Sequence, residues 1–226
     1  MRLVSSLVPY SIRMAMKTAI TLNWRYSQFG TFLTKKCLDH SGSPIPWYTY
    51  PAIEYLRQLD FSACSVFEFG SGYSTLFWAN RARTVTSVES DPHWYEVISK
   101  QVPGNARIIL ESQPSLYIDT IIGERYDLIV IDGIENLRQD CAKKAVTAIL
   151  PGGMVILDNS DWHPQTCKVL RDADLIEVDF HGFGPSVGHC WTTSVFLHRA
   201  FKLVAEDRQP DPAIGGVHLD CDISVS

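Results

Sequence analysis

The sequence lacks any apolar run long enough to cross a bilayer, which takes about 18 consecutive apolar residues. We therefore expect no transmembrane helix. Its first ten residues also lack the compact apolar core and the small-residue cleavage site of a signal peptide. Both absences favour a cytoplasmic protein.

Closely spaced cysteine pairs are missing as well. The sequence has six cysteines and no CxxC pair, which disfavours a zinc site or a disulfide framework. Reduced and mostly buried thiols are expected, as is usual in the cytosol. The six are Cys37, Cys64, Cys141, Cys167, Cys190 and Cys221.

Acidic residues are absent from the first 38 positions, although the whole chain has a net charge of −5. The six basic residues of this segment are Arg2, Arg13, Lys17, Arg25, Lys35 and Lys36. A helical cap packed on the domain is the favoured interpretation, because the apolar residues are too scattered to define a strong face. The alternative is peripheral contact with a membrane or with an acidic partner. The acidic net charge disfavours nucleic acid as a partner.

From position 65 onward, short β-rich runs alternate with helical periods. Strands are predicted at 65–69, 84–89, 106–110, 126–131, 154–157, 175–180 and 193–198. Alternation of this kind predicts a three-layer α/β sandwich with a mostly parallel sheet. The linker 181–189 is too short and too rich in glycine for a crossover helix, so the last strand should pair antiparallel.

Three segments of chain are distinguished on this pattern. We predict a helical N-terminal extension or cap over residues 1–60 and the α/β domain over residues 61–204. A polar C-terminal tail is predicted over residues 205–226. Helices within the domain are expected near 74–80, 93–101, 115–122, 137–150 and 164–172.

The strongest local signal is the run Val66-Phe67-Glu68-Phe69-Gly70-Ser71-Gly72-Tyr73-Ser74. An apolar strand leads into an acid, a G-x-G turn and a helix. Glycines let the backbone approach a ligand closely. The next strand ends at Glu89, about 20 residues after the first glycine, where a carboxylate can accept the hydroxyl protons of a ribose. The third strand ends at Glu111 and Ser112, which are placed to contact an adenine.

A third glycine, which dinucleotide-binding turns use to hold a pyrophosphate, is missing. Thr75 stands at that position, and Glu68 precedes the turn. A carboxylate there repels phosphate and suits a positively charged ligand. The turn therefore favours S-adenosylmethionine over NAD.

With these features, residues from about Ser65 to Phe201 resemble the class I S-adenosylmethionine-dependent methyltransferases, whose Rossmann-like sheet has seven strands with the last antiparallel. The resemblance implies that Gly70 and Gly72 line the methionine part, that Glu68 lies beneath it and that Glu89 holds the ribose. The full cofactor-binding set that it implies is Glu68, Gly70, Gly72, Tyr73, Ser74, Glu89, Glu111, Ser112 and Asp132.

The fourth and fifth strands end at Asp132 and at Asp158-Asn159, and these oxygen donors should meet above the sheet. Their arrangement is similar to the metal ligands of catechol O-methyltransferase-like enzymes, which implies a possible Mg²⁺ site. Those enzymes place a lysine three residues after the first aspartate, where this chain has Glu135. A metal-free interpretation, with Asp132 positioning substrate or cofactor, is therefore favoured.

Catalytic roles are assigned to Asp132 and, as a general base near pH 7, to His163. His181 and His189, which flank the last strand pair, are further histidines that could serve as the base. Trp47 and Tyr48 are expected to contact the acceptor together with Asp158 and Asn159, because aromatic rings can stack on a sugar or an arene. A small hydrophobic cluster that joins the extension to the domain is an equal alternative for the two aromatic residues.

The leading hypothesis is O-methylation of a small molecule or a glycan precursor. Aminopropyl transfer and NAD-dependent oxidation on the same fold are alternatives, disfavoured by the lack of an acidic pair and of the third glycine. A non-catalytic binding or scaffold protein is a further alternative, against which the intact glycines and Glu89 argue.

Overall fold

The computed structural model describes residues 9–205, so Cys221 and nearly all of the predicted C-terminal tail lie outside the described residues. The strands are β1 (Ser65–Phe69), β2 (Thr84–Glu89), β3 (Ala106–Leu110), β4 (Tyr126–Ile131), β5 (Ile149–Leu157), β6 (Ile176–Gly182) and β7 (Trp191–Leu197). The domain helices are α3 (Tyr50–Arg57), α4 (Tyr73–Ala79), α5 (Pro92–Ser99), α6 (Pro114–Asp119), α7 (Arg138–Ala148) and α8 (Pro164–Asp172). Two short 3₁₀ helices, η2 (Glu135–Leu137) and η3 (Ser160–Trp162), follow β4 and β5.

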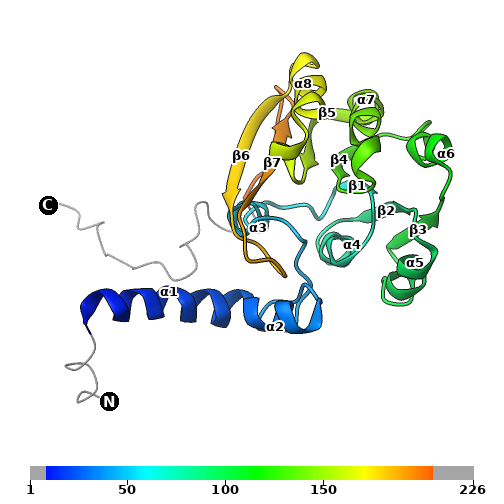
Figure 1. Ribbon diagram of the computed structural model, residues 1–226. Coiled ribbons are helices and arrows are strands. Elements are labelled where there is room, and N and C mark those ends of the chain that lie inside the picture. The colour runs from blue at the N-terminus through cyan, green and yellow to red at the C-terminus, as the bar shows by residue number, and fades with distance from the viewer. Residues whose placement is uncertain (1–8, 206–226) are drawn as a thin grey trace, which may run out of the picture.

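All seven strands form one sheet in the order β3-β2-β1-β4-β5-β7-β6, and Figure 1 shows this sheet together with the helices that cover it. The pairs from β3 through β5 are parallel, whereas β7 pairs antiparallel with both β5 and β6. The order reverses between β1 and β4, and parallel sheets of this type bind ligands at the strand ends beside such a reversal. The predicted fold class is confirmed, including the antiparallel last strand.

The strand at β5 is longer than predicted. It begins at Ile149, which pairs with Tyr126, and its pairing with β4 shifts register before Leu128 meets Met154. Gly152 takes φ +90° within this irregular stretch. The predicted strand began at Met154, because Pro151 and the two glycines after it are typical of a turn or loop. Proline and glycine are tolerated here because the pairing is itself irregular at that point.

Side chains of successive strand residues point to opposite faces and build two cores. On one face Val66, Val130 and Ile156 pack with the apolar residues of α3 and α4. On the other face Phe67, Ile131 and neighbouring residues pack with α6, α7 and α8. The near-continuous apolar run of β4 is explained, because both of its faces are covered.

Five cysteines lie within the described residues, and all five are free. Cys37, Cys64, Cys141 and Cys167 are buried, and only Cys190 is exposed. Burial disfavours the thiolate and raises the pKa of the Cys37 thiol to about 11. The prediction of unpaired, mostly buried thiols is confirmed for these five residues.

The N-terminal extension consists of α1 (Tyr10–Tyr26) and α2 (Gln28–Thr34), and α1 projects away from the sheet (Figure 1). Only Tyr26, at the last position of α1, is buried in that helix. The favoured prediction of a cap packed on the domain is therefore wrong for α1. Apart from Tyr26 and the partly buried Leu22, the large apolar side chains of α1 are exposed. No helix among residues 9–205 is long and apolar enough to span a membrane.

Candidate active site

The turn after β1 lies directly against the end of β4. Gly70 has φ +97°, and a Cβ atom on it would lie 2.9 Å from the carbonyl oxygen of Asp132. The backbone N–H of Asp132 donates to the carbonyl of Phe69 at 3.0 Å. Only glycine fits this left-handed and crowded position. The G-x-G turn and Asp132 are therefore neighbours, as the sequence predicted.

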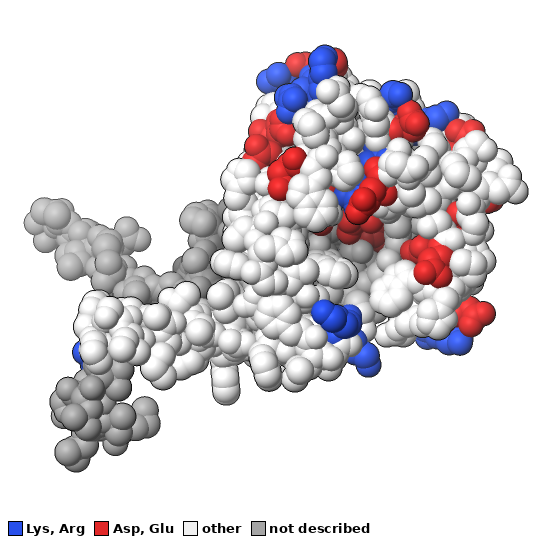
Figure 2. Space-filling view, in the orientation of Figure 1, with Lys and Arg blue, Asp and Glu red and all other residues white. Residues whose placement is uncertain are grey.

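Beside this contact the protein has a cavity of about 370 Å³. Figure 2 shows acidic side chains gathered at a hollow in the middle of the visible face, with a basic side chain next to them. The cavity is lined by Lys35, Cys37, Trp47, Ser71, Gly72, Tyr73, Ser74, Trp94, Asp132, Asp158, Asn159, Trp162, Val187, His189 and Trp191. Seven of the predicted site residues are thereby brought together: Trp47, Gly72, Tyr73, Ser74, Asp132, Asp158 and Asn159.

The cavity wall away from the sheet comes from the extension and from the linker between β6 and β7. The N–H of Tyr50 donates to the carbonyl of Phe183 at 2.7 Å. Ser186 donates to Thr31 of α2 through both its N–H, at 2.9 Å, and its hydroxyl, at 3.1 Å. Segments far apart in sequence thus enclose the space above β4 and β5.

Glu68 lies beneath the turn and is fully buried, with 1% of its surface exposed. Its Oε2 atom accepts from the hydroxyls of Thr75 and of Ser87. Its Oε1 atom is buried and has no hydrogen-bond partner. Burial disfavours the ionised carboxylate, and the pKa of Glu68 rises to about 7. An under-paired buried carboxyl beneath a glycine turn suits a cationic ligand, because a nearby positive charge would favour the ionised form of Glu68.

The raised pKa of Glu68 makes stability depend on pH in an unusual direction. The folded state holds a proton up to about pH 7, whereas the unfolded carboxyl releases it near pH 4.5. The folded state therefore binds more protons between these values, and this group's contribution to the free energy of unfolding falls as the pH rises through that window. The shift corresponds to about 3 kcal/mol. We expect Glu68→Gln to remove that fall, measured by urea unfolding at pH 5 and pH 8.

The matched control is Glu124→Gln, which alters an exposed carboxyl outside the cavity. It should follow the wild-type dependence on pH. If Glu68→Gln also parallels the wild type, the carboxyl of Glu68 is ionised in the folded state and the argument from burial is wrong.

Glu89 ends β2 and stands behind the turn, not in the cavity wall. Its Oε2 atom accepts from the N–H and the hydroxyl of Ser71, at 3.0 and 2.7 Å. Its Oε1 atom accepts from the N–H groups of Ser90 and Asp91, at 2.8 and 2.9 Å. All four acceptor positions of the carboxylate are thus used. A ribose hydroxyl reaches Glu89 only when the Ser71 hydroxyl turns away.

The predicted adenine contacts lie farther out. The hydroxyl of Ser112 donates to the carbonyl of Ser90 at 2.8 Å, and Glu111 accepts from the N–H of Gln113 at 2.8 Å. Neither residue lines the cavity. Both belong to the edge of β3, next to Glu89, so they stay predictions for the outer part of the cofactor.

Arg138, at the start of α7, holds the carboxyl ends of β4 and β5 together. Its Nη2 atom lies 3.2 Å from Oδ1 of Asp132. Its Nη1 atom donates to the backbone carbonyl of Asp158, and its Nε atom donates to the carbonyl of Gly133 at 3.3 Å. Only 5% of the surface of Arg138 is exposed. Sequence reasoning missed Arg138, because no local pattern shows that its side chain points toward the strand ends.

The two aspartates differ in their surroundings. Burial raises the pKa of Asp132 to about 6, opposed by the Arg138 guanidinium. Burial, followed by the Asp132 charge, raises the pKa of Asp158 well above its ordinary value. Asp158 accepts from the Trp191 indole N–H at 3.0 Å and from the Thr193 hydroxyl. Asp132 is therefore the ionised member at neutral pH, and Asp158 holds the proton.

The magnesium site that the catechol O-methyltransferase-like resemblance implied as an alternative is not supported. Within residues 9–205 no group of three or more His, Cys, Asp and Glu side chains is placed to hold a metal ion. Asp132 is paired with the buried guanidinium of Arg138. Both carboxyl oxygens of Asp158 accept a hydrogen bond from the Trp191 indole N–H. A divalent cation at Asp132, Asp158 and Asn159 would meet the positive charge of Arg138. Arg138 occupies the electrostatic role that a metal would have.

Four of the six tryptophans of the chain line the cavity, namely Trp47, Trp94, Trp162 and Trp191. Asp91 caps α5 by accepting from the N–H groups of His93 and Trp94. The Trp94 indole N–H in turn donates to the carbonyl of Ser71 at 2.8 Å. Tyr48, predicted to contact the acceptor, has no exposed surface and belongs to the core. The hydrophobic-cluster alternative is thus correct for Tyr48, while Trp47 faces the cavity.

The histidines are placed differently from the prediction. His163 does not line the cavity, and its Nε2 atom is buried without a hydrogen-bond partner. Burial, with the nearby Arg138, lowers the pKa of His163. His189, on the linker between β6 and β7, is exposed and lines the cavity beside Trp191. Its position depends on how that linker folds back, which the sequence does not encode in any short motif.

The chain has the Rossmann-like fold of the class I S-adenosylmethionine-dependent methyltransferases. No family model matches the sequence, and no curated protein matches it either. Among solved structures, the chain is similar to the precorrin-6y C5,15-methyltransferase of Geobacter metallireducens, with a TM-score of 0.53 and 12% identity over 66% of this chain and 87% of that one. It is also similar to the O-methyltransferase TomG of Streptomyces achromogenes, involved in tomaymycin synthesis and solved with SAM, with a TM-score of 0.50 and 16% identity over 65% of this chain and 77% of that one. At these identities the likeness concerns the fold.

Proposed function

We propose that the protein is an S-adenosylmethionine-dependent methyltransferase that methylates a hydroxyl of a small molecule or a sugar. One observation carries the proposal: a tryptophan-lined cavity opens on a G-x-G turn that is surrounded by the carboxyl groups of Glu68, Glu89 and Asp132. The acidic surroundings suit a sulfonium and an ammonium. The flat aromatic walls suit the ring of an acceptor.

The donor, when bound, supplies a methyl group on positively charged sulfur. Gly70 and Gly72 leave space for its amino-acid part, and Asp132 offers a carboxylate to its ammonium. Trp47, Trp162 and Trp191 hold the acceptor and exclude water from the reacting atoms. A cavity that held an acceptor hydroxyl in line with that methyl group and its sulfur would supply much of the rate through alignment alone.

The proton of the acceptor hydroxyl needs a base, and His189 is the histidine that lines the cavity. Asp132 is ionised near neutral pH and is the second candidate. His163, proposed from the sequence, acts on the acceptor only if η3 moves, because its free nitrogen is buried.

The test is a calorimetric titration with S-adenosylmethionine, S-adenosylhomocysteine and NAD. Both sulfur nucleotides should bind, and NAD should not. We expect Glu89→Ala to weaken binding by about 1–3 kcal/mol, because charged hydrogen bonds to the ribose and the ordering of the turn are lost. Ser71→Ala should bind at least as tightly as the wild type, because the Ser71 hydroxyl competes for Glu89.

Glu96→Ala, an exposed carboxyl on α5, is the control and should leave the affinity unchanged. Binding of NAD without either sulfur nucleotide would overturn the proposed function. Equal losses in Ser71→Ala and Glu89→Ala would show that Glu89 acts only through the turn and that the ribose lies elsewhere.

A further inference from the structure

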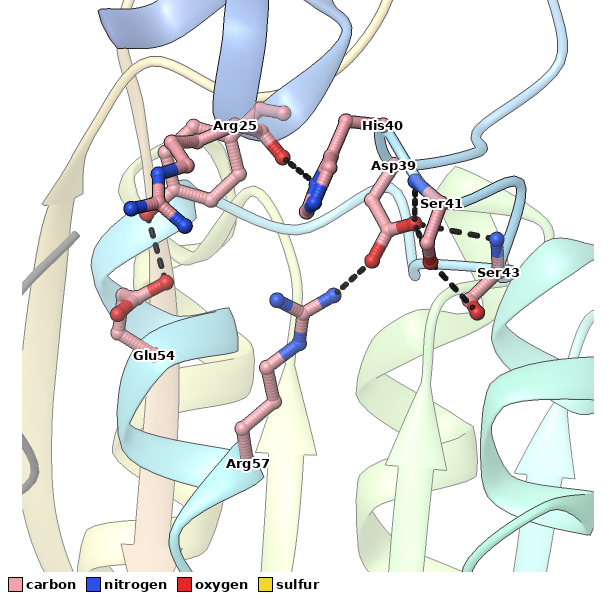
Figure 3. Close-up of polar contacts among 8 residues, drawn as sticks. Arg25, Asp39, His40, Ser41, Ser43, Glu54 and Arg57 are labelled. Atoms are coloured by element: carbon pink, nitrogen blue, oxygen red, sulfur yellow. Dashed lines mark hydrogen bonds and ion pairs between the residues drawn. The ribbon is translucent and has the colours of Figure 1, made fainter.

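Helix α1 is held firmly at its C-terminal end and nowhere else in the described residues. The Tyr26 ring stacks on Tyr50 at 3.8 Å between ring centroids, and its hydroxyl donates to Glu54 at 2.7 Å. Figure 3 shows this end of α1 beside α3, with the Asp39 carboxylate between Arg57 and the loop residues Ser41 and Ser43. The anchored end fixes the direction in which the rest of α1 projects.

A second face of α1 carries large apolar side chains that are exposed. Leu22 packs partly buried against the core near Tyr26, whereas Ile12, Met16 and Ile20 follow one another at intervals of four residues and so share another face of the helix. Ile12 is 50% exposed, Met16 53% and Ile20 59%.

Helix α2 also exposes large apolar side chains. Phe29 and Leu33, four residues apart, are 64% and 70% exposed. Trp24, four residues after Ile20 on α1, is 72% exposed. Many large exposed apolar side chains on two successive helices mark an interaction surface.

The charge of this surface is of one sign. Residues 9–38 contain Arg13, Lys17, Arg25, Lys35 and Lys36 and no acid. The part of α1 and α2 visible in Figure 2 shows no acidic side chain. Pairing of two copies through this surface would bring these cations together without any acid of the segment to offset them. The positive charge of the segment favours a partner with negative charge. The exposed apolar side chains favour a partner that also offers an apolar region.

We propose that α1 and α2 bind the surface of an anionic phospholipid bilayer. Aliphatic and aromatic side chains of an interfacial helix enter the boundary of the acyl chains, while flanking Lys and Arg contact the headgroups. Lys35 and Cys37, directly after α2, line the cavity. Binding of the extension therefore places the cavity near the bilayer.

The test is co-sedimentation of the full chain with vesicles of phosphatidylcholine alone and with vesicles that also contain phosphatidylglycerol. Binding should require phosphatidylglycerol and weaken with added salt. Arg13→Glu with Lys17→Glu should reduce binding by at least about thirtyfold, because each basic residue near the surface contributes about fivefold or more. Ile20→Ser with Trp24→Ser should also reduce binding to the vesicles that contain phosphatidylglycerol.

The matched control is Lys100→Glu with Ile122→Ser, which changes one exposed basic and one exposed apolar residue outside the extension. It should bind as the wild type does. Urea midpoints equal to that of the wild type show that each variant is folded. Unchanged vesicle binding in both extension variants overturns the proposal. So does lipid-free dimerisation, measured by sedimentation velocity, that Ile20→Ser with Trp24→Ser abolishes, since a second copy would then be the partner.

Discussion

Arg138→Met should lower the free energy of unfolding by about 3–5 kcal/mol near neutral pH. Removal of one partner from a buried ionic group leaves the other charge without compensation. Here the loss leaves Asp132 without its guanidinium. It also leaves the carbonyl groups of Gly133 and Asp158 and the side-chain oxygen of Asn159 without their donor. Urea unfolding at constant pH measures the change.

The deficit should shrink as the pH falls. Arg138 lowers the pKa of both aspartates against the effect of burial. Without it both carboxyls stay protonated to higher pH, so the variant is most destabilised where the wild-type Asp132 is ionised, above about pH 6. At acidic pH Asp132 and Asp158 are neutral in both the wild type and the variant. The remaining loss of stability then comes only from the missing hydrogen bonds of Arg138 to carbonyl groups.

Arg199→Met is the control, because Arg199 forms an exposed ion pair with Asp174. Its cost should stay within about 1 kcal/mol. Adding Asp132→Asn to Arg138→Met should recover part of the stability, which a double-mutant cycle measures. A cost for Arg138→Met no larger than that of the control would show that the two strand ends need no counter-charge.

His189→Gln should reduce turnover by about 10² to 10⁴, the range that a positioned general base contributes. The affinity for S-adenosylmethionine should not change, because His189 lines the acceptor side of the cavity. Phenols and methyl glycosides serve as hydroxyl probes, and release of S-adenosylhomocysteine measures turnover.

His163→Gln is the discriminating comparison. Its Nε2 atom is buried, so turnover should change little. The opposite pattern, a large loss for His163→Gln and none for His189→Gln, would restore the sequence-based assignment and require movement of η3 during the reaction.

The two histidines illustrate how far sequence reasoning reached. Strand ends are predictable, because an apolar run that stops at a polar residue places that residue at the edge of the sheet. The ends of β1, β2, β3 and β4 were predicted at the observed residues. Among the residues on connecting segments Trp47 was predicted, but Lys35 and Val187 were not. Their positions depend on contacts such as those of Ser186 with Thr31, which join residues 155 positions apart.

The three candidate metal ligands show a second limit of prediction from sequence. Asp132, Asp158 and Asn159 were predicted to meet, and they do so at the cavity. Their chemistry was decided by Arg138, whose guanidinium enters between the strand ends from α7. A helix turned by one residue would point that side chain elsewhere, and no local pattern distinguishes the two cases.

The amino-acid sequence by itself determined the sheet, its antiparallel last strand and the acidic glycine turn, because these follow from the alternation of apolar residues and from backbone freedom at Gly70. Tertiary structure alone decided that α1 projects from the domain, that Tyr48 is core and that His189 faces the cavity. The reason is physical: periodicity fixes which residues of one element share a face, whereas the neighbour that covers the face is chosen by packing over the whole chain.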